Sequence, residues 1–152
     1  MPVMDPRTWL EHLTPVQCWQ LLASTPVGRV GVLRDSAPEI YPVNHVVDHA
    51  SIAFRTDPGG KLHALTRSPA VCFEVDAVDP ATASGWSVLV KGRATEVREL
   101  HEVARLAALD LRYWVPGTKQ HWVRIVADEV TGRRIWAPER RGSDGAPGAD
   151  GG

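Results

Sequence analysis

The sequence predicts a mainly β domain, an antiparallel barrel of six to seven short strands with two or three helices. Short segments of alternating apolar and polar residues recur along the 152 residues, which is the pattern of half-buried strands. Most are joined by a few turn-forming residues, such as Arg34-Asp35-Ser36, and tight turns join antiparallel neighbours. Because an open antiparallel sheet exposes two edges, we expect the sheet to close into a barrel.

Local signals predict the individual elements. Thr14 is suited to cap a helix with Pro15 in its first turn, and a short amphipathic helix is predicted over 16–23. Gly92, in the middle of a long predicted strand, indicates a bulge or bend. Asp128–Glu129 are expected to separate the last two strands. Strands are predicted over 28–33, 40–47, 51–55, 70–75, 86–97, 122–126 and 130–136, and helices over 61–66 and from Leu100 to a break at Val115-Pro116-Gly117.

Composition divides the chain into three parts. Residues 1–12 show no clear periodicity, and we expect a flexible N-terminus. Residues 13–138 carry the predicted strands and helices and form one domain. Residues 139–152 are mainly Gly, Ala, Asp and Arg with almost no apolar side chains, so a disordered tail is expected.

Charge and hydropathy argue against several classes of partner. The formal net charge is −1, whereas a protein built mainly to bind nucleic acid is expected to carry a basic excess. The sequence has no apolar run long enough to span a membrane, and its start lacks the apolar core of a signal peptide. A cytoplasmic protein that contacts neither nucleic acid nor membrane is therefore expected.

Thiol and metal chemistry find little support in the sequence. Cys18 and Cys72 lie far apart in apolar segments and form no C-x-x-C pair, so we expect two buried thiols. His45 and His49 are four residues apart on a predicted strand and turn, where that spacing does not bring two rings together. No metal site is expected.

The segment Phe54–Leu62 combines a strand end, two glycines and the start of a helix. Free N–H groups at a helix N-terminus attract anions, and glycines let the backbone approach them closely. Arg55 and Lys61 add two cationic donors, and Thr56 adds a hydroxyl. An ordinary solvated turn fits the same residues, so this segment alone leaves both interpretations open.

The order of several short motifs resembles the pyridoxamine-phosphate-oxidase-like family of FMN-binding split β-barrels, in particular its short bacterial branch. The resemblance runs from about Leu13 to Trp136, which is nearly all of the predicted domain. The motifs that carry it are Val27-Gly28-Arg29-Val30, Tyr41-Pro42-Val43-Asn44, Phe54-Arg55-Thr56 with Lys61, Cys72-Phe73-Glu74-Val75-Asp76, and Gly85-Trp86-Ser87-Val88 running into Lys91-Gly92.

The resemblance implies a split β-barrel of the FMN-binding type and a homodimer that binds two FMN molecules at the subunit interface. One strand of each subunit lines the isoalloxazine ring, and another reaches the flavin from the partner. The matching positions are Arg55, Thr56 and Lys61 for the phosphate, Pro42, Val43 and Asn44 for the ring, and Trp86 and Ser87 for the strand from the other subunit.

The resemblance leaves the reaction open. After Trp136 the chain lacks the basic segment with which longer pyridoxamine phosphate oxidases bind the phosphate of their substrate, so oxidation of vitamin B6 is not expected. An FMN-dependent oxidoreductase acting on an unidentified small molecule is the first hypothesis. A deazaflavin-dependent reductase on the same fold and a non-catalytic flavin store or sensor are the alternatives. His45 is a candidate for proton transfer, although such a histidine is more often structural.

Overall fold

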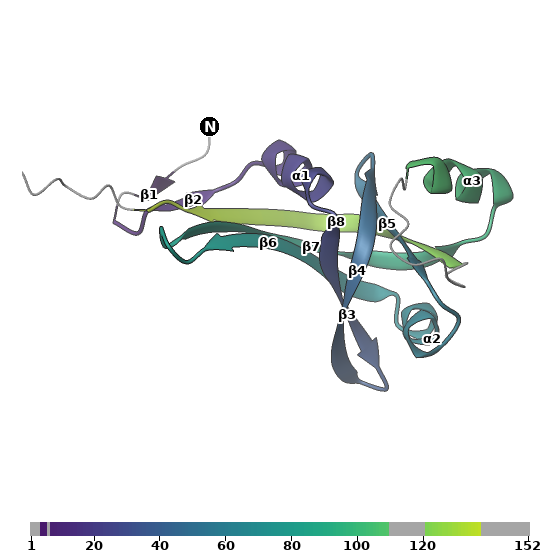
Figure 1. The fold of residues 1–152 in the computed structure, drawn as a ribbon. Coiled ribbons are helices and arrows are strands. Elements are labelled where there is room, and N and C mark those ends of the chain that lie inside the picture. The colour runs from purple at the N-terminus through teal and green to yellow at the C-terminus, as the bar shows by residue number, and fades with distance from the viewer. Residues whose placement is uncertain (1–3, 6, 110–120, 138–152) are drawn as a thin grey trace, which may run out of the picture.

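The computed structural model describes residues 4–5, 7–109 and 121–137, which form one antiparallel sheet and three helices (Figure 1). The helices are α1 (Pro15–Ser24), α2 (Gly60–Arg67) and α3 (Leu100–Leu109). The strands are β1 (Met4–Asp5), β2 (Leu10–His12), β3 (Val27–Arg34), β4 (Ala37–Asp48), β5 (Ser51–Thr56), β6 (Ala70–Asp79), β7 (Ser84–Val97) and β8 (His121–Ile135).

Six of the described strands close into a ring. Their order is β8-β5-β4-β3-β6-β7, and β7 pairs again with β8. All of these pairings are antiparallel. The short β1 and β2 continue the sheet beyond β8. The predicted antiparallel split barrel is therefore confirmed, with six strands in the ring.

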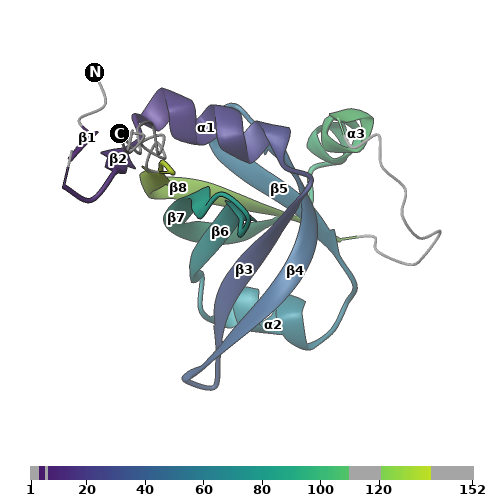
Figure 2. The same cartoon turned by 60° about the vertical axis from the view of Figure 1, so that its left-hand side comes forward.

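The apolar core fills the ring and is covered by two helices. In Figure 2, α1 lies above the barrel strands and α2 below them. Cys18 and Leu22 of α1 are buried, as are Ala64 and Leu65 of α2. The largest completely buried side chains of the barrel include Phe54, Phe73, Ile52, Ile125, Val30 and Val88. Burial of Leu65 fixes α2, and the loop that precedes this helix is held with it.

The third helix lies on the outside of the barrel. Leu106 of α3 is fully buried against Trp122, Val46 and Ala53, which project from the outer side of β8, β4 and β5. The helical spacing after Leu100 is thus confirmed for the part of α3 that the structure describes. The predicted break at residues 115–117 and the predicted tail at 139–152 lie outside the described residues.

Two short strands precede α1, and the helix itself begins with a side-chain cap. The predicted cap of α1 is confirmed: the Thr14 hydroxyl accepts from the backbone N–H of Gln17, whose side chain accepts in return from Thr14 N–H. Before it, β2 pairs with the end of β8, and Glu11 is buried there, accepting a hydrogen bond from Trp136 Nε1 at 2.8 Å. A strand of three residues is too short to show periodicity, so its long-range partner is what fixes it.

The predicted break between the last two strands is wrong. β8 runs without interruption through Asp128–Glu129. Lys91 pairs with Glu129 and Gly92 with Ala127, so Asp128 is the extra residue of a β-bulge. The predicted bulge at Gly92 is therefore confirmed, and it also accounts for the polar pair opposite. A bulge and a turn favour similar residues, and only the pairing with β7 distinguishes them.

The prediction of two buried thiols is right for Cys18 and wrong for Cys72, which is exposed. Cys72 lies on β6 between the buried Val71 and Phe73, so alternation along the strand turns its side chain outward.

In the described part of the chain, no helix has the length and apolarity needed to cross a membrane.

Gly28 is held by contact with a core side chain. A Cβ at this position would overlap the ring of Phe73, which is completely buried. We expect Gly28→Ala to lower the free energy of unfolding by about 2 kcal/mol through overpacking, measured by urea denaturation. In the double variant with Phe73→Leu, part of this loss should be recovered; strictly additive losses would contradict the assigned contact.

Candidate functional site

The strand β4 changes partner in its middle. Residues Ala37 to Asn44 pair with β3, whereas His45 to Asp48 pair with β5. Pro42 lies in the first part, opposite Arg29 of β3, and its lack of an N–H is tolerated where a strand has a partner on one side. Among the strands that the structure describes, none pairs with the other side of this part of β4.

Side chains along β4 alternate between the outer face and the core. Pro42 and Asn44 are exposed, and Val43 is buried between them. Asn44 and Arg55 are the residues next to the last β4–β5 pair, His45–Phe54, and alternation turns both side chains to the opposite face from that pair. Arg55 is half-buried, with its guanidinium carbon 5.0 Å from the centre of the Trp122 ring. The structure therefore brings the predicted ring strand and the predicted phosphate arginine together on one outer face.

Thr56 and Lys61 occupy different surroundings. Thr56 is 2 % exposed, and its hydroxyl donates to the Asp57 carbonyl at 3.4 Å, so this hydroxyl is turned away from the outer face that carries Arg55. Lys61 lies in the first turn of α2, with its ammonium 5.1 Å from the centre of the Tyr41 ring. The Tyr41 hydroxyl in turn donates to Glu39.

Arg34 is a further cationic residue near the start of α2, and the sequence did not indicate it. The guanidinium of Arg34 lies against Gly60 at the start of α2, where a Cβ would be 2.8 Å from Arg34 Nη1. Arg34 also lies 4.0 Å from the Glu39 carboxylate. Arg34 is the last residue of β3, and no local pattern connects it with a helix that begins after two further strands.

His45 lies in the interior. It is 3 % exposed, its ring makes an edge contact with Phe73, and its Nε2 is 2.8 Å from the Leu22 carbonyl oxygen. Because a carbonyl only accepts, this geometry requires the proton on Nε2. The bond ties β4 to α1, which is a structural role, and the side chain does not reach the outer face of Pro42 and Asn44.

Within one chain, Trp86 and Ser87 lie far from Arg55 and Lys61, the residues predicted to bind a phosphate. Glu96 lies near the end of β7 and lines a groove with Pro58 and Gly60, so this end of β7 adjoins the loop before α2. Trp86 precedes Glu96 by about ten residues on the same strand, which corresponds to roughly 30 Å. Figure 1 shows β6, β7 and β8 extending away from α2 as a long ribbon. Most of the length of β7 therefore separates Trp86 from Arg55 within one chain.

The tip of this ribbon carries a pocket of about 440 Å³ that Trp86 helps to line. Its apolar members include Val78 and Ile135, whose side chains are 72 % and 49 % exposed in the single chain. Large exposed apolar side chains around a concave surface are typical of an interface or a ligand site.

One outer surface of the sheet connects the two regions. Arg29 of β3 is opposite Pro42 on one side and Glu74 of β6 on the other, and it forms an ion pair with Glu74 at 3.2 Å. Burial and the neighbouring Asp76 raise the pKa of Glu74. On β7, Ser87 is opposite Asp76, so the surface runs from the ring strand to the ribbon.

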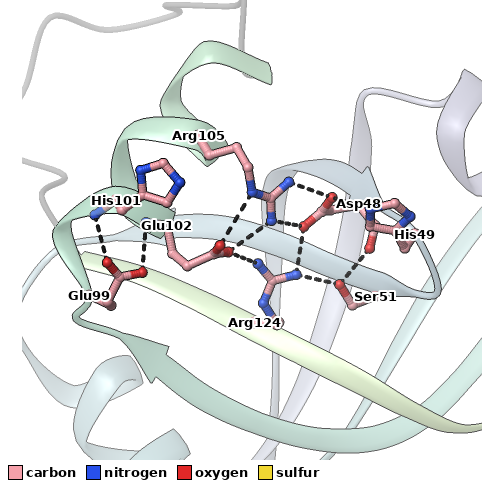
Figure 3. Close-up of polar contacts among 8 residues, drawn as sticks. All are labelled: Asp48, His49, Ser51, Glu99, His101, Glu102, Arg105 and Arg124. Atoms are coloured by element: carbon pink, nitrogen blue, oxygen red, sulfur yellow. Dashed lines mark hydrogen bonds and ion pairs between the residues drawn. The ribbon is translucent and has the colours of Figure 1, made fainter.

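A network of charged residues fixes α3 beside this site (Figure 3). Asp48, 6 % exposed, accepts from both terminal nitrogens of Arg105 at 2.9 and 2.6 Å and from Arg124 at 2.8 Å. Glu102 accepts from both arginines as well, and Arg124 also donates to the Ser51 hydroxyl. The hydrogen bond from Arg105, followed by that from Arg124, holds the pKa of Asp48 well below its usual range. This network adjoins the apolar contact under α3, which includes the same Trp122 that meets Arg55.

Comparison with known proteins agrees with this architecture. The family profile described as pyridoxamine 5'-phosphate oxidase matches residues 14–134. An uncharacterised protein of Mycobacterium tuberculosis is 40 % identical over 129 residues, covering 82 % of this chain and 84 % of that protein. A solved structure from Corynebacterium glutamicum, assigned to the pyridoxamine 5'-phosphate oxidases, is 35 % identical with a TM-score of 0.74, covering 90 % of this chain and 100 % of that one. The FAD-binding protein of Mycobacterium smegmatis is 34 % identical with a TM-score of 0.68, covering 82 % of this chain and 98 % of that one.

Fold and strand order thus define a six-stranded antiparallel split barrel. Within that class, the chain belongs to the pyridoxamine 5'-phosphate oxidase family.

Proposed function

We propose that this chain is a homodimeric flavin-dependent oxidoreductase whose two sites each hold the FMN portion of a flavin. The observation that carries the proposal is that Asn44 and Arg55 flank the last β4–β5 pair, His45–Phe54, and share the outer face in the segment that leads to α2. The M. smegmatis relative is an FAD-binding protein, which supports a flavin as the ligand class.

The donor set suits a flavin phosphate. Arg55 offers a planar fork of donors, Lys61 offers a point charge, and the first turn of α2 has free N–H groups. Arg34 supplies a further positive charge against Gly60. The donors are cationic or backbone groups, as a phosphate dianion requires.

The ring would lie on the outer face along Pro42, Val43 and Asn44. The backbone edge that β5 leaves unpaired there can bond to polar atoms of the ring, while Pro42 and Asn44 present their side chains to it. When bound, a flavin supplies two-electron redox chemistry, and the protein positions it and excludes water. Trp86 and Ser87 of the second copy would cover the ring from the other side.

A binding protein without catalysis is the second candidate, and the interior position of His45 favours it. The buried ring removes the one proton-transfer group that the sequence suggested.

Titration of flavin-free protein with FMN tests the proposal. We expect quenching of flavin fluorescence and a rise in thermal stability, of about 2.7 kcal/mol when free FMN is 100 times its Kd. Sedimentation should show a dimer. A parallel titration with a deazaflavin distinguishes the two cofactors. If the deazaflavin binds more tightly than FMN, the deazaflavin is the cofactor. A protein that neither quenches nor is stabilised by any flavin would overturn the proposal.

A further inference from the structure

Two cations of the proposed phosphate site each lie over an aromatic ring. Arg55 of β5 is directly opposite Trp122 of β8, and its guanidinium carbon is 5.0 Å from the centre of that ring. The ammonium of Lys61, in the first turn of α2, is 5.1 Å from the centre of the Tyr41 ring. Both distances are within the range of an attractive cation–π contact. We refer to the rings of Trp122 and Tyr41 as the ring supports.

The ring of Trp122 is fixed by the helix behind it. Trp122 is 3 % exposed and packs in one cluster with Leu106 of α3, which is fully buried, and with Val46 and Ala53. A ring enclosed in close-packed side chains has little room to turn. Trp122 therefore offers Arg55 a surface of fixed position.

The ring of Tyr41 is fixed at both of its ends. Tyr41 is partly buried and packs against the main apolar core, and its hydroxyl donates a hydrogen bond to Glu39. The hydrogen bond to Glu39 is the main cause that raises the pKa of Tyr41, so the hydroxyl keeps its proton and the bond persists at neutral pH. Lys61 thus also has a support that is held in place.

Ordered cations bind a ligand at a lower entropic cost. The side chains of arginine and lysine have many rotamers, and the loss of this freedom on binding opposes affinity. A cation that is already held over a ring has lost part of that freedom before the ligand arrives. Contact with the face of a ring also consumes none of the hydrogen-bonding capacity that an oxygen partner would take from the cation.

From these contacts we infer that Trp122 and Tyr41 are positioning residues of the flavin site, which orient Arg55 and Lys61 for the phosphate before the flavin binds. The inference rests on the proposed function and extends it, because each ring acts through the cation that it supports. It also gives α3 a part in the site, since Leu106 of this helix packs against the support of Arg55.

Titration of flavin-free protein with FMN and with riboflavin tests the inference, because riboflavin has the same ring system and no phosphate. Trp122→Leu should weaken FMN binding about fivefold, and Tyr41→Leu about threefold, with riboflavin affinity unchanged in both. Trp122→Phe and Tyr41→Phe keep an aromatic ring and should retain most of the FMN affinity. Neither loss should exceed the loss caused by removal of the supported cation itself.

Two further variants separate positioning from general packing. Val75→Ala removes a fully buried side chain of β6 without removing a ring, and it should change neither affinity. In a chain that already carries Arg55→Ala, Trp122→Leu should cause no further loss of FMN affinity, because the ring then has no cation to support.

One measurement needs no flavin. In the free natural protein, the ring current of Trp122 should shift the NMR signals of the Arg55 side chain upfield, and Trp122→Leu should abolish this shift.

The outcomes separate this inference from the proposed function. Equal weakening of FMN and riboflavin by Trp122→Leu, or a full additional loss in the Arg55→Ala background, would show that the ring only stabilises the fold and would overturn the inference. If Trp122→Leu does not fold, equal FMN affinities of Tyr41→Leu and Tyr41→Phe would overturn it. A natural protein that binds neither FMN nor riboflavin would overturn the proposed function itself.

Discussion

Arg55→Ala should weaken flavin binding by about 2 kcal/mol, or roughly thirtyfold in Kd, because a phosphate would lose its forked, charge-assisted donor. Arg55 also lies over Trp122, so the stability of the flavin-free variant must be measured alongside the affinity. Arg55→Lys should recover part of the loss, since it keeps the charge and loses the fork.

Lys61 supplies a companion measurement at the same site. Lys61→Ala should cost about 1 kcal/mol of flavin affinity, less than Arg55→Ala, because an ammonium offers a point charge without bidentate geometry. Arg67→Ala replaces an exposed arginine of the same helix and serves as the control, because it should leave the flavin Kd unchanged. Unchanged Kd values in both Arg55→Ala and Lys61→Ala would show that the phosphate lies elsewhere.

Asp48→Asn should produce the largest loss of stability, about 3 kcal/mol in the free energy of unfolding. Asp48 is nearly buried between Arg105 and Arg124, and removal of its charge takes away their buried anion, whereas Glu102, which both arginines also contact, is more than a third exposed. Because Arg105 is more than a third exposed, we expect the lower end of the range for buried pairs. Urea denaturation measures the effect, and Asp128→Asn, at the exposed bulge of β8, is the matched control.

The contribution of Asp48 to the free energy of unfolding should depend on pH. The folded-state pKa of Asp48 is depressed, chiefly by Arg105, so the unfolded chain takes up the proton first as the pH falls. The contribution of Asp48 is fully present above about pH 4, near the ordinary aspartate pKa, and is lost as the pH falls toward the folded-state value. The stability difference between the natural protein and Asp48→Asn should therefore be smaller at pH 3 than at pH 7. A constant difference would mean that the charge of Asp48 contributes nothing.

The positions of most strands and helices could be predicted from local patterns. The turn residues Asp35 and Ser36 both adopt positive φ and join β3 to β4 where the sequence indicated a turn. The cap at Thr14 was likewise readable, because a capping box uses neighbouring residues. Asp128–Glu129 could not be interpreted locally, because their place in a bulge depends on pairing with residues more than thirty positions away.

The candidate site shows a similar division. The resemblance to the family predicted eight cofactor-binding residues, but the sequence did not show which of them lie on the same face of the sheet. Alternation beyond the last β4–β5 pair, His45–Phe54, puts Asn44 and Arg55 on one face and turns His45 and Thr56 inward. Arg34 reaches α2 only through the fold, and the distance along β7 separates Trp86 from the phosphate segment. Tertiary contacts therefore determine which of the predicted residues can act on one ligand.

Mixing two defective variants tests the central claim, that each flavin site combines Arg55 of one chain with Trp86 of the other. Arg55→Ala and Trp86→Ala should each bind flavin weakly alone. If they are unfolded and refolded together in equal amounts, each mixed dimer should contain one site with both natural residues, so about one site in four should regain natural affinity. Calorimetric titration counts those sites. Recovery to this level is the predicted result, and a mixture in which every site remains weak would contradict a site shared between two chains.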